Sequence, residues 1–256
     1  MWTAILPAAG LGTRLRPSRY PKELLPVVYE CIGDVEGVRP RAVSEFALRS
    51  FSDAGIAKCY IVISPWKSEI LNYFGDGSAL NMELAYLCQE EARGLPHALD
   101  LAYPWAGGSD VVFAMPDTIL TPVDCVSRLR RLYLQTGADL ALGVFPTDEP
   151  ERLGPVVMHG NRVLRVYDKC PSPPARNTWG FAIWGPRFWD LLHQQLQRED
   201  LKGGREPVMG DFFNLAAEIG YDVRAEFFQS GSFTDIGTPR GIRRYLESVP
   251  LNRVLA

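Results

Sequence analysis

Features that define several other classes of protein are missing from this chain of 256 residues. Its five cysteines are scattered singly, without a CxxC pair or a cysteine–histidine cluster at zinc spacing, and it has only three histidines. No apolar run reaches membrane-spanning length. The N-terminus lacks the charged leader and long apolar stretch of a signal peptide. We therefore expect a cytoplasmic protein with reduced cysteines and no membrane association.

The sequence also has no large excess of positive or negative charge. The sequence has 27 basic and 30 acidic residues, a net charge of -3, and only short basic clusters. A nucleic-acid-binding surface usually needs a basic face and a high isoelectric point, so no nucleic-acid partner is expected. The hydrophobic fraction of 46% and the charged fraction of 22% are ordinary for globular proteins. The composition predicts a single domain over residues 1–256, long enough to bury a sizeable core.

Short apolar segments alternate with helix-period segments in the first half of the chain. We expect strands at 3–8, 58–64, 83–88, 110–115 and 139–145, and helices near 42–54, 67–74, 95–104 and 122–136. This alternation is typical of an α/β fold with a doubly wound, mostly parallel, Rossmann-like sheet.

Strand signals come in closer succession after Pro146. Strands are expected at 155–158, 162–168 and 178–184, and their close spacing predicts a smaller antiparallel insertion attached to the first layer. Helices near 186–198 and 209–219, a last strand near 223–228 and a helix near 239–247 follow. The domain then divides softly into halves 1–146 and 147–256, and we expect the ligand site to lie across that boundary.

A turn of small residues, AAGLGTR from Ala8 to Arg14, follows the first expected strand. Small residues allow backbone N–H groups to approach a polyphosphate, and Arg14 and Lys22 supply positive charge. The turn matches neither a Walker A loop nor the dinucleotide fingerprint. A tight turn into a helix is the alternative interpretation, but ligands bind at the carboxyl ends of strands in open α/β sheets. The segment therefore predicts a phosphate site.

Asp117 ends an apolar strand. A carboxylate at the carboxyl end of a strand can bind Mg²⁺, which takes one or two protein carboxylates together with phosphate oxygens. A turn-forming aspartate is an equally good interpretation from these residues alone.

The AAGLGTR turn, followed by PKELLP from Pro21, closely resembles the signature of the sugar nucleotidyltransferase family. That family includes glucose-1-phosphate thymidylyltransferases and UTP–glucose-1-phosphate uridylyltransferases, and the resemblance covers most of the chain. It implies that the turn and the lysine after it bind the nucleotide, through Ala8, Ala9, Gly10, Gly12, Thr13, Arg14 and Lys22. Arg14 and Lys22 would stabilise charge on the pyrophosphate and the α-phosphate.

The same resemblance implies two metal ligands. Asp117 would bind the catalytic Mg²⁺ and contact the nucleotide. Asp235, in the segment FTDIGT, would be the second ligand, although a turn residue before the last helix is the alternative.

Two further segments resemble substrate-binding motifs of the family. CQEEARGLP from Cys88 implies that Gln89 reads the pyrimidine edge and that Gly94 allows the backbone to approach the base; a polar strand end is the alternative for Gln89. YDKCP implies that Lys169 binds the sugar phosphate and Asp168 the sugar hydroxyls, whereas a solvated corner is the alternative. Weaker matches that would line the sugar site are Gly154, Gly180 and Arg205.

The resemblance implies transfer of a nucleoside monophosphate from UTP or dTTP to a sugar 1-phosphate, with glucose 1-phosphate the first candidate. Such a reaction depends on positioning and charge stabilisation and needs no nucleophilic side chain. A non-catalytic nucleotide-sugar sensor and a cytidylyltransferase for another phosphorylated alcohol remain alternatives. The chain departs from the family by about ten extra residues between Glu30 and Arg39 and by ending soon after its last helix. The assembly seen in relatives therefore does not carry over, and a homo-oligomer is left open.

Overall fold

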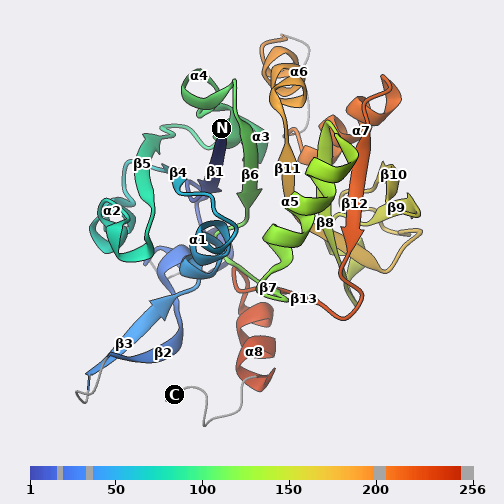
Figure 1. Cartoon of the computed structure of the whole chain (residues 1–256). Coiled ribbons are helices and arrows are strands. Elements are labelled where there is room, and N and C mark those ends of the chain that lie inside the picture. Colours follow the sequence, from blue (N-terminus) through green and yellow to red (C-terminus); the bar gives the residue numbers. More distant parts are fainter. Residues whose placement is uncertain (16–19, 33–36, 199–205, 249–256) are drawn as a thin grey trace.

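A computed structural model describes residues 1–15, 20–32, 37–198 and 206–248 of the chain. Its main feature is a nine-stranded mixed sheet with the order β5-β4-β1-β6-β11-β8-β12-β10-β9 (Figure 1). Helices cover both faces of this sheet. The arrangement confirms the predicted α/β class with a doubly wound, Rossmann-like sheet.

Four strands from the first half form the parallel part of the sheet. They are β1 (Trp2–Pro7), β4 (Lys58–Ile63), β5 (Glu83–Cys88) and β6 (Asp110–Ala114). Next to β6, the reversed strand β11 (Asn177–Trp184) pairs antiparallel with both β6 and β8 (Leu140–Pro146). The strand β12 (Val223–Phe227) runs parallel to β8.

Of the antiparallel insertion expected after Pro146, two strands form a hairpin at one edge of this same sheet, whereas the third, β11, lies inside the main sheet between β6 and β8. The hairpin consists of β9 (Val156–His159) and β10 (Arg162–Val166), and β10 pairs antiparallel with β12. The second half of the chain therefore extends the sheet of the first half.

Alternate side chains of the central strands enter two different cores. In β1, Ile5 packs into the core beneath α3 (Leu95–Asp100), α6 (Pro186–Leu196) and α7 (Met209–Glu218). Its neighbours Ala4 and Leu6 face the opposite core, beneath α1 (Ser44–Asp53), α2 (Ser68–Phe74) and α5 (Cys125–Thr136). The period of two along a strand thus explains why helices are needed on both faces.

The helix expected at 95–104 is interrupted. It forms α3, which ends at Asp100, and the short α4 (Tyr103–Ala106). Pro104 has no N–H to donate to the Asp100 carbonyl, so a continuous helix would lose a hydrogen bond there. Both pieces still pack on the same side of the sheet, through Leu99 and Ala106.

Two small sheets were not anticipated. One pairs β7 (Thr118–Thr121) with β13 (Ser232–Asp235), and the other is the hairpin of β2 (Pro26–Ile32) and β3 (Gly37–Ala42). The described parts of the extra segment between Glu30 and Arg39, up to Ile32 and from Gly37, belong to the strands of this hairpin, which extend away from the main sheet in Figure 1. The last helix, α8 (Pro239–Ser248), follows β13 and packs Ile242 and Tyr245 against the buried cluster of Val43, Ile119 and Ile236.

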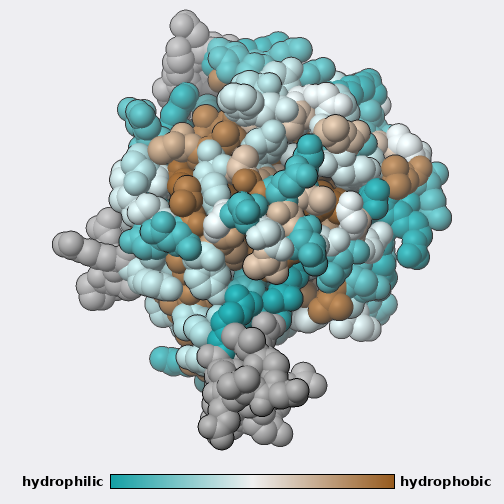
Figure 2. Space-filling view, turned by 60° about the vertical axis from the view of Figure 1, so that its left-hand side comes forward, coloured by the Kyte–Doolittle hydropathy of each residue, from teal (hydrophilic) through white to brown (hydrophobic). Residues whose placement is uncertain are grey.

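The surface is of mixed polarity. On the face shown in Figure 2, hydrophobic residues come to the surface in small patches among hydrophilic ones, as in ordinary globular proteins. Of the cysteines, Cys59, Cys88, Cys125 and Cys170 are free thiols. None of the helices in the described parts of the chain is long and apolar enough to cross a bilayer.

Candidate active site

Many of the predicted site residues line one cavity of about 360 Å³. Both halves of the chain contribute to it, as expected for a site across the boundary near Pro146. The predicted residues among its lining are Arg14, Asp117, Gly154, Asp168, Lys169, Gly180 and Asp235. The motifs for phosphate, metal and sugar therefore meet in one place, although they are spread over more than 200 positions of the sequence.

The glycine-rich turn leaves the carboxyl end of β1. Gly12 adopts φ +62°, a left-handed conformation that favours glycine. At Gly10 an added Cβ would meet no atom within 4 Å, so the space beside the backbone is open. Ala8 and Ala9 are buried in the two cores and hold the base of the turn. After them the turn reaches the surface, where Gly10, Thr13 and Arg14 are exposed.

Pairing of β7 with β13 brings the two metal-ligand candidates together. Asp117 immediately precedes β7, and its carbonyl accepts a 2.8 Å hydrogen bond from the N–H of Ile236. Asp235 ends β13, opposite Thr118. Both carboxylates approach Gly237, where a Cβ would be 2.2 Å from Asp117 Oδ2 and 3.0 Å from Asp235 Oδ1. A side chain at residue 237 would therefore clash with the Asp117 carboxylate and crowd that of Asp235.

These two carboxylates influence each other. Burial and then the negative charge of Asp117 raise the pKa of Asp235, while a 2.7 Å hydrogen bond from the Gly237 N–H opposes the rise. A bound cation would relieve the repulsion. In the described residues no group of three or more His, Cys, Asp and Glu side chains is arranged to hold a metal. A metal at this position would rest on two carboxylates, a donor set that suits Mg²⁺ when phosphate oxygens complete the coordination.

Lys22 supplies positive charge at the same point. It begins the short 3₁₀ helix η2 (Lys22–Leu24), and its Nζ lies 2.5 Å from Asp117 Oδ2. Burial alone would lower the pKa of Lys22, but the contact with Asp117 outweighs it and the pKa is raised. The lysine is therefore a fixed cation beside the candidate metal ligand.

A second ion pair, not predicted from the sequence, lies just behind the first. Lys67 Nζ donates to both carboxylate oxygens of Glu23 at 2.9 Å and to the Ala8 carbonyl at 2.7 Å. The two side chains are only 7% and 1% exposed. Burial raises the pKa of Glu23 and lowers that of Lys67, and each partner opposes the shift of the other. Lys67 thus ties the base of the glycine-rich turn to the residue that follows Lys22.

Asp168 lines the cavity with two glycines against it. Its Oδ2 accepts a 2.9 Å hydrogen bond from the Gly210 N–H in α7, and its Oδ1 accepts a 3.4 Å one from Trp179 Nε1. A Cβ at Gly154 or Gly210 would lie 2.5 Å or 2.3 Å from these oxygens. Burial raises the pKa of Asp168, and the two hydrogen bonds oppose the rise. The carboxylate is thus held in one orientation.

Lys169, unlike Asp168, has an unusual backbone conformation and an exposed side chain. Its φ of 52° is unusual for a residue with a side chain, and its N–H donates to the Leu153 carbonyl at 2.9 Å. The exposed side chain lines the cavity. Gly180 also lines the cavity, and a Cβ there would come within 3.1 Å of both Phe233 and Phe145. Arg205 lies outside the described residues.

Gln89 and Gly94 are not among the residues that line the cavity. Gln89 follows β5, and its N–H donates to the Ile63 carbonyl at 2.8 Å. Gly94 precedes α3 with φ +91°, and a Cβ there would lie 2.6 Å from Glu206 Oε1. Leu95, the next residue, does line the cavity.

The cavity also contains residues that no motif indicated. Arg152 ends the 3₁₀ helix η4 (Pro150–Arg152), and Glu206 precedes α7. Met115 and Thr118 come from either side of Asp117. The positions of Met115 and Thr118 close to Asp117 could have indicated that they line the site, whereas the segments around Arg152 and Glu206 have no motif or periodicity.

Comparison with known proteins gives a consistent result over nearly the whole chain. A family model described as nucleotidyl transferase matches residues 3–249. The low-salt glycan biosynthesis nucleotidyltransferase Agl11 of Haloferax volcanii is 28% identical over 244 residues, which cover 93% of this chain and 63% of that protein. The glucose-1-phosphate thymidylyltransferase of Streptomyces griseus is 24% identical over 236 residues, covering 91% and 62% respectively. The chain thus spans somewhat less than two thirds of the length of these relatives.

Solved structures share the fold. A Bacillus anthracis protein in complex with sucrose has a TM-score of 0.83 and 18% identity, with 100% of this chain and 99% of that chain covered. A UDP-glucose pyrophosphorylase from Acinetobacter baumannii has a TM-score of 0.76 and 21% identity, with 96% and 92% covered.

Proposed function

Because the chain belongs to the nucleotidyl transferase family, we propose that it transfers a nucleoside monophosphate from UTP or dTTP to a sugar 1-phosphate and releases pyrophosphate. Glucose 1-phosphate is the first acceptor to test, since relatives are named for it. The observation that carries the proposal is the pair of carboxylates, Asp117 and Asp235, which both approach Gly237 in a cavity that is also lined by Arg14 and Lys169.

The residues of the site would have different roles in the reaction. Asp117 and Asp235 would hold Mg²⁺, which would supply charge stabilisation on the phosphate oxygens. Arg14 faces the cavity from the glycine-rich turn and would stabilise the negative charge that develops on the leaving pyrophosphate. Lys22 adds a cation that is already fixed in place, so little reorganisation is needed as the charge moves.

At the other end of the cavity, the chain would position the attacking phosphate. Lys169 would bind the sugar phosphate as a point charge, and Asp168 would accept hydrogen bonds from sugar hydroxyls through lone pairs not used by Gly210 and Trp179. Holding both substrates in one cavity makes the attack on the α-phosphorus effectively unimolecular.

A matrix of nucleoside triphosphates against sugar 1-phosphates, with pyrophosphate release as the readout, tests the proposal. We expect one pyrimidine triphosphate with one sugar 1-phosphate to give most of the turnover, and only in the presence of Mg²⁺. Binding of nucleotide sugars without turnover of any pair would contradict the proposal and favour a sensor. Turnover of CTP with another phosphorylated alcohol would favour a cytidylyltransferase.

We predict that the two substrate pockets separate kinetically. Lys169→Ala should raise the KM for sugar 1-phosphate about tenfold, because it removes a charge-assisted contact with phosphate, and should leave nucleotide preference unchanged. Gln89→Ala should alter the relative use of UTP, dTTP and purine triphosphates and leave the KM for sugar 1-phosphate unchanged. Steady-state kinetics with each substrate varied in turn measure both effects.

Exposed residues of the same types provide matched controls. Lys58→Ala removes a lysine that is 51% exposed, and Gln194→Ala removes an exposed glutamine on α6. Neither change should alter either KM. If Lys169→Ala changes nucleotide choice and spares the sugar phosphate, the assignment of Asp168 and Lys169 to the sugar end is wrong.

A further inference from the structure

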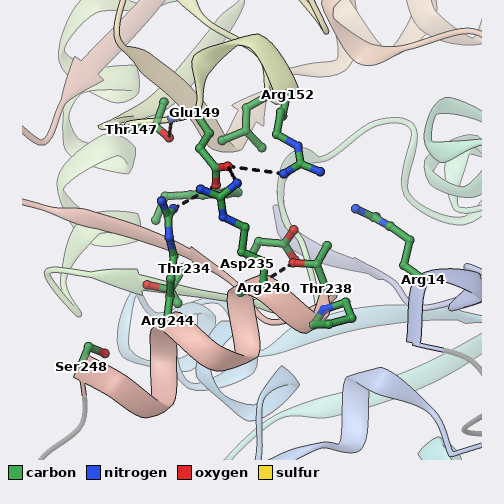
Figure 3. Close-up of a pocket in the computed structure, with 14 residues that line it drawn as sticks. Arg14, Thr147, Glu149, Arg152, Thr234, Asp235, Thr238, Arg240, Arg244 and Ser248 are labelled. Carbon is green, nitrogen blue, oxygen red and sulfur yellow. Dashed lines mark hydrogen bonds and ion pairs between the residues drawn. The ribbon is translucent and has the colours of Figure 1, made fainter.

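Beside the proposed active site lies a larger cavity, of about 680 Å³, whose lining includes Arg14, Arg152, Arg240 and Arg244 (Figure 3). We call it the arginine pocket. Arg240 and Arg244 project from α8, one turn apart, and Arg152 comes from η4. The pocket shares a wall with the active-site cavity, because Arg14 and Asp235 line both. Anything bound in one cavity therefore lies next to the other.

One carboxylate organises three of these arginines. Glu149 Oε2 accepts a 2.9 Å hydrogen bond from Arg244, and Glu149 Oε1 accepts a 3.4 Å one from Arg152 and pairs with Arg240 at 2.5 Å. The Glu149 side chain is only 18% exposed. In Figure 3 the three guanidinium groups converge on it, and Arg14 extends toward the same space from the other side.

The pocket has more positive than negative charge. Four arginines against two carboxylates, Glu149 and Asp235, leave a net charge of +2 on its lining. Each contact with Glu149 uses one nitrogen of a guanidinium group that has five N–H donors. The remaining donors of three converging guanidinium groups can meet the oxygens of an anion. Planar guanidinium groups bind phosphate with two parallel hydrogen bonds, so the pocket suits a phosphate-rich ligand.

We propose that the arginine pocket binds inorganic pyrophosphate, so that the product of the reaction moves from Arg14 into a second anion site. This inference rests on the proposed function, because only that reaction makes pyrophosphate beside Asp235. The shared Arg14 favours pyrophosphate over a separate nucleotide, since the leaving group already lies at that arginine. In the reverse reaction the pocket delivers pyrophosphate to the active site.

Titration calorimetry with inorganic pyrophosphate tests the pocket directly. The variant Arg240→Gln/Arg244→Gln should bind pyrophosphate about tenfold more weakly than the natural protein, because two charge-assisted contacts are lost. Arg243→Gln is the matched control: Arg243 is exposed on the same helix, does not line the pocket, and its loss should leave the affinity unchanged. The single variants Arg240→Gln and Arg244→Gln report on the same site if the double variant is unstable.

The reverse reaction gives a second readout. In the double variant the KM for pyrophosphate should rise about tenfold while the KM for the nucleotide sugar stays unchanged. Equal pyrophosphate affinity in the double variant and the Arg243→Gln control would overturn the proposal. So would a loss of nucleoside triphosphate affinity with pyrophosphate affinity intact, or orthophosphate binding as tight as that of pyrophosphate. Because the titration needs no turnover, an inactive protein that binds pyrophosphate in this pocket would contradict only the proposed function.

Discussion

Asp117→Asn and Asp235→Asn are each expected to lower turnover about 10²–10³-fold, the size of effect seen when one preorganised electrostatic contact is removed from an active site. Asparagine preserves the shape of the side chain and removes the charge that would hold Mg²⁺. Both carboxylates approach Gly237 and the charge of Asp117 acts on Asp235, so the two would act on one ion. The double variant should therefore be about as slow as either single variant, because residues that act as a unit are not additive.

Turnover measured over a range of Mg²⁺ concentrations, beside metal affinity from Mn²⁺ titration, checks this expectation. Asp53→Asn, an exposed change at the end of α1, is the control and should have no effect. A variant that keeps most of its turnover at limiting Mg²⁺ would show that its aspartate is not a metal ligand. Multiplying losses in the double variant would show that the two carboxylates do not serve the same ion.

The pH dependence of metal binding follows from the same contact. Burial and Asp117 raise the pKa of Asp235, so acidification protonates Asp235 at a higher pH than an ordinary aspartate and weakens the metal site there. In Asp117→Asn the repulsion is gone, and the pKa of Asp235 should fall back. Its carboxyl resonance followed by NMR against pH should show that fall, and an unchanged pKa would mean that the carboxylates do not interact.

Local patterns predicted most of the large elements but not the pairing that builds the metal site. The strands β1, β4, β5 and β6 are short, mainly apolar segments, and the predicted strand at 83–88 coincides with β5. In contrast β7 and β13 have four residues each, too few for a period, and lie more than 100 positions apart. Only the resemblance to a family indicated that Asp235 belonged with Asp117.

The roles of the glycines could likewise be predicted from the sequence only in part. Motif matching indicated Gly154 and Gly180 without a physical reason, and the structure supplies one: Asp168 with Trp179 in the first case, and two phenylalanine rings in the second, lie where a Cβ would be. Gly210, which has the same relation to Asp168, was not singled out because its contact comes from a residue 42 positions away. Steric requirements of this kind depend on tertiary neighbours, so they leave no local trace.

No motif in the sequence indicated a role for Lys67. Its replacement is nevertheless expected to have the second of the two largest effects, a loss of stability. Lys67→Met leaves Glu23 buried without its partner, and breaking a buried ion pair in this way costs about 3–5 kcal/mol of stability. It also removes the donor to the Ala8 carbonyl at the base of the glycine-rich turn. Urea denaturation should show the loss, whereas Lys58→Met, which removes a surface lysine, should change stability by at most about 1 kcal/mol.

The pH dependence of stability and a double variant distinguish the electrostatic effect of the Lys67–Glu23 pair from its effect on the position of the glycine-rich turn. Without Lys67 the raised pKa of Glu23 should rise further, because the lysine opposes the effect of burial. A raised pKa in the folded state favours folding at low pH, so the loss of stability in Lys67→Met should shrink as the pH falls through that pKa.

In Glu23→Leu/Lys67→Met neither charge of the buried pair remains, and most of the stability should return. Its turnover should nevertheless stay low, because Ala8 still lacks its anchor and the turn that carries Arg14 is less firmly placed. Recovery of both stability and turnover in the double variant would mean that the pair only balances its own charges and does not position the turn.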